Sequence, residues 1–239
     1  MRSLYGAIVN YNKKEIMAVN IDTVYQKVLA FANKEQRGYI TPQEFNLFAN
    51  QAQLEIFEQY FYDLNQASRI HGNDTIYADI DDMLEEKIQV FEATSSTYVN
   101  DNVYRLHSVR YNGANCEILR KLDFNDVQSG GALTRPSDTR PVANVSGGVL
   151  SVIGSDNASL TPDEISYVKK PTKAVWDYFV VNDKALYNTN TSVDFELHPS
   201  EENELVYKIL KFAGVSMRRE DIMRAGQGME LAQVQQEKQ

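Results

Sequence analysis

Residues 20–65 constrain the fold most, because they predict two amphipathic helices joined at a sharp corner. In the first helix, over about 20–35, apolar residues recur every three or four positions and form one buried side. The second helix, from about 42 to 66, has two apolar sides. The first side comprises Phe45, Phe48, Ala49, Ala52, Ile56 and Tyr60, and the second comprises Leu54, Phe57, Phe61 and Leu64. Such a helix lies at the centre of its own subunit or buries its second side against another subunit.

The corner between these helices comes close to a calcium-binding EF-hand loop without matching its chemistry. Gly38 and Glu44 stand where an EF-hand has its invariant glycine and its last carboxylate. Arg37, however, would place a guanidinium where the loop needs a ligand oxygen, and a cation repels Ca²⁺. Thr41, Pro42 and Glu44 instead suit the N-cap, first and third positions of a capped helix, and Gly38 suits the residue that ends the preceding one. We therefore predict a capped helix corner and no calcium site.

The composition limits the kind of protein that this chain can be. Its 239 residues suffice for one large domain or two small ones. A formal net charge of -9 argues against a protein that mainly grips phosphates, but not against one that stands beside DNA. Cys116 is the single cysteine, so an internal disulfide and a cysteine metal cage are excluded. No apolar run approaches the length of a membrane span.

The order of patterns predicts an α+β protein, in which an N-terminal helical bundle is completed by a C-terminal helix and an antiparallel β region is inserted. Asn112-Gly113 predicts a hairpin, and a last helix is expected from Ser200 to Gly214. Met17 looks like a natural start, so we expect residues 1–16 to be over-called. Strand patterns lie at 149–153, 165–169, 176–181, 184–188 and 193–197. The expected parts are an extension (1–16), N-terminal helices (17–95), a β-rich insertion (96–198) with a long turn-rich loop (125–148), C-terminal helices (199–225) and a polar, mobile tail (226–239).

Side chains that could carry chemistry are few and scattered. The histidines are His71, His107 and His198, and none has a neighbour at metal-ligand spacing. A nucleophilic pair of Cys116 and His107 is conceivable across the predicted hairpin. Two unrelated strand residues explain the same pattern more simply, so we expect no catalytic residue there.

Carboxylates gather near the start of the third predicted helix, which covers about 79–92. Asp79, Asp81 and Asp82 lie where the helix dipole favours negative charge, and Glu85 and Glu86 complete the cluster. Paired carboxylates could bind a metal ion or act as acid and base, so a metal-dependent hydrolase or nuclease using the cluster near Asp81 stays an alternative. Consecutive helical residues point in different directions, however, and we favour a solvated helix face with no metal and no cofactor.

Two long stretches resemble structural proteins of tailed bacteriophages. YQKVLAFANKEQRGYITPQEFNLFANQAQLEIFEQYFYDLN resembles their N-terminal segment, and DFELHPSEENELVYKILKFAGV resembles their C-terminal segment. Between them, SVIG and ISYVKKPTKAVWDY look like strands of the same proteins, so the resemblance spans most of residues 17–215. The order of helices, β insertion and helix is also similar to the head-to-tail adaptor of short-tailed, marine and crAss-like phages.

This resemblance implies a non-enzymatic virion protein of the neck between head and tail. Such an adaptor forms a homo-oligomeric ring, expected here to be a dodecamer, and its partners are the portal and a tail or second neck protein. DNA passes nearby without sequence-specific binding, and no cofactor, catalytic residue or membrane is implied. The expected location is the virion, assembled in the host bacterial cytoplasm. Another virion role, such as a capsid-vertex or minor tail protein, stays open.

We expect contacts with other subunits and partners at three places. The contact residues are Phe57, Phe61 and Leu64 on the second helix, Arg135 and Arg140 in the long loop, and Arg218 and Arg219 near the C-terminus. The loop and the polar tail would become ordered on the portal or the tail. The basic cluster near the C-terminus could face DNA, an acidic partner surface or the acidic first turn of the preceding helix.

Overall fold

The computed structural model describes residues 18–33, 40–67, 75–131, 133–182, 184–216 and 220–237. These residues form helices and mostly antiparallel sheets, which confirms the predicted α+β class. The chain divides into two compact units. The helical unit combines the described residues up to Val90 with those from Pro171 onward, and the β unit is Phe91–Lys170.

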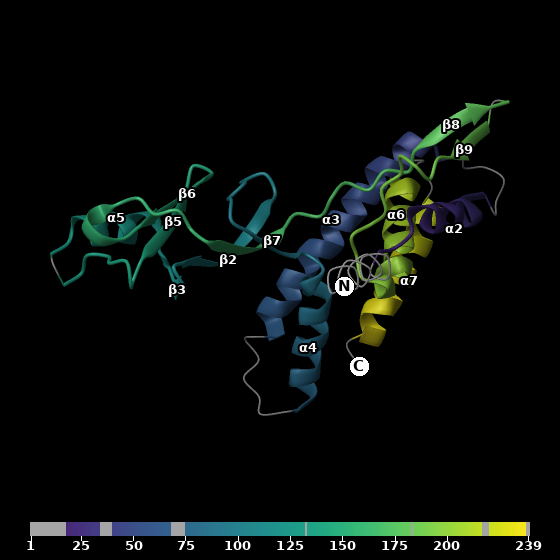
Figure 1. Ribbon diagram of the computed structural model, residues 1–239. Helices are drawn as coiled ribbons and strands as arrows, with labels where there is room; N and C mark the ends of the chain where they lie inside the picture. The colour runs from purple at the N-terminus through teal and green to yellow at the C-terminus, as the bar shows by residue number, and fades with distance from the viewer. Residues whose placement is uncertain are drawn as a thin grey trace, which may run out of the picture. The chain divides into compact units, whose positions relative to one another are not determined.

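The helical unit combines helices from the N-terminal and C-terminal parts of the sequence around one core (Figure 1). Its helices are α2 (Ile21–Asn33), α3 (Pro42–Ala67), α4 (Thr75–Gln89), α6 (Glu202–Ser216) and α7 (Glu220–Glu237). Helix α6 packs against α2, α3 and α7, and α4 packs against α3. Large side chains from both ends of the chain, such as Phe45 and Ile209, are fully buried. Their burial removes apolar surface from water and thereby stabilises the bundle.

Helix α3 begins with the capping box that the sequence predicts. The Thr41 N–H and hydroxyl donate to Glu44 Oε2 at 3.0 and 2.8 Å, and the Glu44 N–H donates to Thr41 Oγ1 at 3.2 Å. These hydrogen bonds, the one from the Thr41 backbone first, lower the pKa of Glu44. Glu44 therefore acts as a helix cap, while the remainder of the EF-hand-like loop, residues 34–39, lies outside the described residues.

The β unit contains two small sheets. One has the order β1 (Glu92–Ser95), β7 (Glu164–Lys169), β2 (Val103–Tyr111) and β3 (Ala114–Asn115), all antiparallel. The other joins β4 (Glu117–Ile118), β5 (Val142–Ser146) and β6 (Val149–Ile153), with β4 and β5 parallel. Val109, Cys116 and Ile165 lie in the core of the β unit. The predicted hairpin turn is present, and Asn112 and Gly113 both adopt positive φ.

The loop predicted at 125–148 is shorter than expected. Helix α5 (Lys121–Ser129) occupies its beginning and β5 occupies its end, which leaves residues 130–141 as the connection. The helix forms because Phe124 is buried and the half-buried Val127 lies one turn later, so both pack beside Val142. The predicted strand at 193–197 is also absent: Val193 and Phe195 make isolated bridges, and residues 171–198 belong to the helical unit.

The C-terminal part departs most from the prediction. Helix α6 continues through Gly214 to Ser216, and α7 runs to Glu237, where we expected a polar, mobile tail from residue 226. The reason is close packing of α7 on α6. A Cβ on Gly226 would lie 3.0 Å from the Lys211 nitrogen and 3.2 Å from the Tyr207 carbonyl oxygen. These distances are tighter than ordinary Cβ contacts, so glycine at this position allows the two helix backbones to approach closely.

Candidate functional site: exposed apolar surfaces and a buried ionic cluster

The predicted contact side of α3 is largely occupied by the subunit's own packing. Phe57 is fully buried, and Phe61 and Leu64 are half-buried. The rings of Phe57 and Phe61 meet edge to face with 5.0 Å between centroids. The Phe57 side chain is therefore not available to a neighbouring subunit in this conformation, and any contact through α3 must use other residues.

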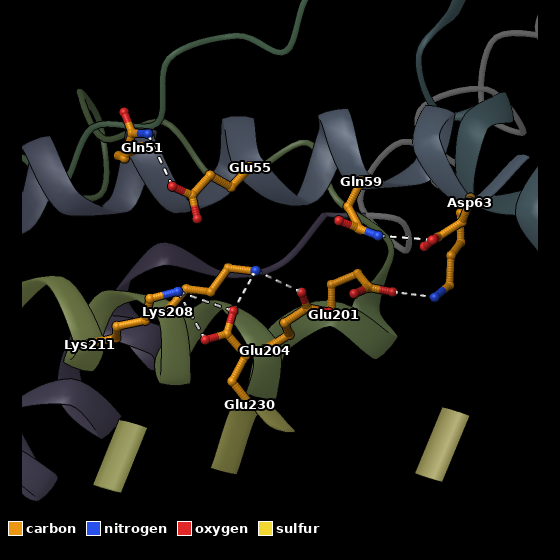
Figure 2. A network of polar contacts seen from close by, with 10 residues as sticks. Gln51, Glu55, Gln59, Asp63, Glu201, Glu204, Lys208, Lys211 and Glu230 are labelled. Carbon is orange, nitrogen blue, oxygen red and sulfur yellow. Dashed lines mark hydrogen bonds and ion pairs between the residues drawn. The ribbon is translucent and has the colours of Figure 1, made fainter. Parts of the chain in front are cut away.

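A row of α3 side chains that shares only Leu54 with this predicted side does reach the surface. Leu47, Leu54 and Tyr62 are 71%, 41% and 57% exposed, and Glu58 between the last two is also exposed. Spacings of seven and eight residues place them on one side of the helix. We call Leu47, Leu54, Glu58 and Tyr62 the α3 stripe. Beside it, Figure 2 shows two hydrogen-bonded pairs along the helix, Gln51 with Glu55 at 3.2 Å and Gln59 with Asp63 at 2.8 Å.

A second apolar surface is the hairpin of β8 (Tyr178–Val181) and β9 (Lys184–Tyr187). It forms a two-stranded sheet of its own and extends away from the helices of its unit (Figure 1). Phe179 and Val180 are 49% and 64% exposed, and Val181 and Leu186 are also exposed. An isolated hairpin is marginally stable in water unless another element packs on it. Exposed apolar residues on such an element indicate a surface for a partner.

The base of the hairpin, in contrast, is firmly anchored. Trp176 is buried and stacks on Tyr178 and Tyr187, with ring centroids 5.7 and 5.8 Å apart. Its Nε1–H donates to Asp22 Oδ1 on α2 at 2.9 Å. The aromatic base is therefore part of the core, and the exposed part of the hairpin begins beyond it.

Three side-chain amides on α3 hold the extended segment that leads into the hairpin. The amides are those of Asn46, Asn50 and Gln53, and they contact the backbones of Trp176, Ala174 and Thr172 respectively. Two backbone N–H groups donate to the asparagine Oδ1 atoms at 2.8 and 3.0 Å, and the Nδ2 atoms donate back at 3.1 and 2.9 Å. The Gln53 Nε2 donates to the Thr172 backbone carbonyl at 2.8 Å. Helix α3 thus satisfies backbone groups that a neighbouring strand would otherwise pair.

An ionic cluster joins α7 to the bundle, as Figure 2 shows. The Lys208 ammonium lies 2.9 Å from Glu230 and 3.3 Å from Glu204, and Lys211 lies 3.0 Å from Glu230. Glu201, which is 1% exposed, pairs with Lys87 of α4 at 2.6 Å. This cluster is not among the sites predicted from the sequence. Its one sequence signal is the i, i+4 spacing of Glu204 and Lys208 on the apolar side of α6.

The cluster shifts the pKa values of its members in different directions. Burial, and then a hydrogen bond and charge repulsion from Glu201, raise the pKa of Glu204 to about 7, although Lys208 opposes this shift. Burial would lower the pKa of Lys208, but Glu230 and Glu204 outweigh it and the pKa rises. Burial would raise the pKa of Glu230, but the two lysines outweigh it and the pKa falls. Glu204 is therefore the member that changes charge near neutral pH.

The other predicted residues lie apart from these features. Arg135 is exposed and donates to the Gly130 carbonyl at 3.0 Å, and the exposed Arg140 lies 3.3 Å from Glu117. Arg218 and Arg219 lie outside the described residues. Both loop arginines belong to the β unit, and the α3 stripe and the hairpin belong to the helical unit.

The geometry gives no support to a Cys116–His107 nucleophilic pair or to a metal site in the acidic cluster. Cys116 is buried, and burial followed by the charge of Asp163 raises its thiol pKa, which disfavours the nucleophilic thiolate. His107 is exposed near Glu92, at 3.9 Å. In the acidic cluster, Asp82 is exposed, and the side chains of Asp79 and Asp81 lie outside the described ones. Among described residues, no group of three potential ligands could hold a metal ion.

Comparison of this chain with known protein families and with curated proteins gives no match. Within the described ranges, no helix is long and apolar enough to cross a membrane. Among the described residues, the helical unit thus carries two separate exposed apolar surfaces, the α3 stripe and the β8–β9 hairpin.

Proposed function

We propose that this chain is a non-enzymatic structural protein of a tailed-phage virion, a ring-forming adaptor of the neck that links the portal to the tail. The observation that carries the proposal is the pair of uncovered apolar surfaces on the helical unit. A ring is built from repeated head-to-tail contacts, so each subunit needs two different patches that fit one another. The helical unit carries two different exposed apolar patches, the α3 stripe and the β8–β9 hairpin.

The layout of the fold adds support. The stretches that resemble phage structural proteins form α2, α3, the end of β6, β7 and α6, so helices, strands and a C-terminal helix follow one another as the resemblance implies. The net charge of -9 suits a channel protein that lets DNA slide past without gripping it. In such a ring each helical unit would supply contacts to its neighbours, and the β unit would be free to meet the portal or the tail.

The test is the assembly state of the purified protein. Purified full-length protein would be examined by mass photometry and negative-stain imaging, alone and mixed with the portal protein of the same phage. We expect a closed ring, formed alone or on the portal. A monomer that ignores both the portal and the tail proteins would contradict the adaptor role and favour another position in the virion, such as a capsid vertex or a minor tail site.

A further inference from the structure

The two apolar patches of the helical unit suggest how one copy meets the next. We propose that the β8–β9 hairpin of one subunit docks on the α3 stripe of the adjacent subunit; this inference rests on the proposed function. A hairpin-to-hairpin contact would be two-fold symmetric and would end at a dimer, whereas hairpin-to-stripe contacts repeat around a ring. They also cover both apolar patches at once.

The register of the hairpin defines the docking face. Phe179 pairs with Leu186, and Val181 pairs with Lys184. Directly paired residues, and residues two positions apart in a strand, lie on the same face. One face therefore carries Phe179, Val181 and Leu186 together with a single cation, Lys184. All four are exposed.

The α3 stripe offers matching chemistry and size. Leu54 and Tyr62 are exposed apolar anchors, and Glu58 between them is an exposed anion. Helix α3 contains no Lys or Arg, so all of its own charged side chains are acidic. From residue 54 to 62 the helix rises about 12 Å, and a strand of four residues spans about 13 Å. The hairpin face can thus lie along this segment with Lys184 near Glu58.

The first experiment breaks each patch separately in the full-length chain. Phe179→Asp removes the docking face of the hairpin and keeps the stripe, and Leu54→Asp does the reverse. We expect each variant alone to be monomeric by mass photometry. A one-to-one mixture should give a dimer that grows no further, because only one of its two contacts is intact. Val149→Asp, at an exposed apolar residue of the β unit, is the matched control and should assemble like the wild type.

The second experiment exchanges the charges. Lys184→Glu and Glu58→Lys should each raise the protein concentration needed for assembly by about tenfold, and the double variant should restore it, as expected for a direct ion pair at a rim. Both positions are exposed, so circular dichroism should show an unchanged fold. A double variant no better than the single ones overturns the pairing.

The outcomes separate the docking from the proposed function. Rings that persist in Leu54→Asp or Phe179→Asp overturn the docking but leave the adaptor role intact. A dimer formed by Leu54→Asp alone shows hairpin-to-hairpin pairing and also overturns it. Where the wild type assembles only on the portal, the variants are measured there. Wild-type protein that assembles under neither condition overturns both proposals.

Discussion

At the scale of single residues, Glu204 is a mostly buried carboxyl whose pKa is raised to about 7. Its carboxyl is largely buried beside Glu201, and only Lys208 favours its ionised form. Because its pKa is raised in the folded state, the folded protein binds a proton that the unfolded chain releases. The contribution of this protonated carboxyl to the stability of the fold is complete at pH values below the unfolded pKa of about 4.5. It is lost as the pH rises through the folded pKa of about 7.

Replacing Glu204 with Gln should remove this pH dependence. Because Gln mimics the protonated carboxyl, we expect the variant to be more stable than the wild type at pH 8, by about 2 kcal/mol, and similar to it at pH 5. Urea unfolding at both pH values measures the difference. Glu85→Gln, at an exposed carboxylate of α4, is the control and should change neither value. An equal loss of stability at both pH values would show that the ion pair with Lys208 dominates instead.

Two glycines of α7 offer a matched test of packing at the residue scale. Gly226 lies against the backbone of α6, whereas a Cβ on Gly228 would meet nothing within 4 Å. We expect Gly226→Ala to destabilise the protein by about 1–2 kcal/mol, because backbone atoms cannot yield as a side chain can. Gly228→Ala should stabilise it by up to about 1 kcal/mol through helix propensity. Thermal unfolding of both variants tests the pair, and equal effects would mean that α7 does not pack closely on α6.

At the scale of elements, the link between α3 and the hairpin depends on side-chain amides. Asn46, Asn50 and Gln53 follow the i, i+4, i+7 spacing of one helix face, so the sequence contains a signal for this row. It escaped prediction because a row of amides does not reveal its partner. The partner is a segment more than a hundred residues away in the chain.

Asn50→Ala tests this link. Alanine is the better helix former, but the variant loses both hydrogen bonds to Ala174 and leaves backbone groups unsatisfied. We expect a loss of about 2 kcal/mol and a changed emission from Trp176, the single tryptophan, which lies two residues along the same segment. Gln51→Ala, on the exposed side of the helix, should be neutral. An unchanged emission spectrum in Asn50→Ala would argue against the anchoring role.

At the scale of the whole molecule, the chain comprises two units with separate cores, and Trp176 reports on the helical unit alone. Val109→Ala in the core of the β unit should therefore leave the fluorescence transition in urea unchanged, while lowering the transition of the β unit by about 1–2 kcal/mol. That second transition is followed by hydrogen exchange of residues 91–170. Val24→Ala, in the other core, should shift the fluorescence transition instead. A common shift in both variants would show that the units unfold together.

The sequence by itself determined the features that depend on neighbouring residues. The α+β class, the capped start of α3 and the Asn112-Gly113 turn all follow from local patterns, because capping, turn geometry and helical periodicity act over a few positions. The adaptor role stays a proposal that begins from resemblance.

The tertiary structure decided which surfaces are covered. Phe57 and Leu54 belong to the same predicted apolar side, yet one is fully buried and the other is 41% exposed. The polar C-terminal segment forms a helix because Gly226 and Glu230 meet groups on α6. Burial depends on what lies across from a residue, and those neighbours come from distant parts of the chain. Periodicity shows that a side is apolar, but only packing shows what covers it.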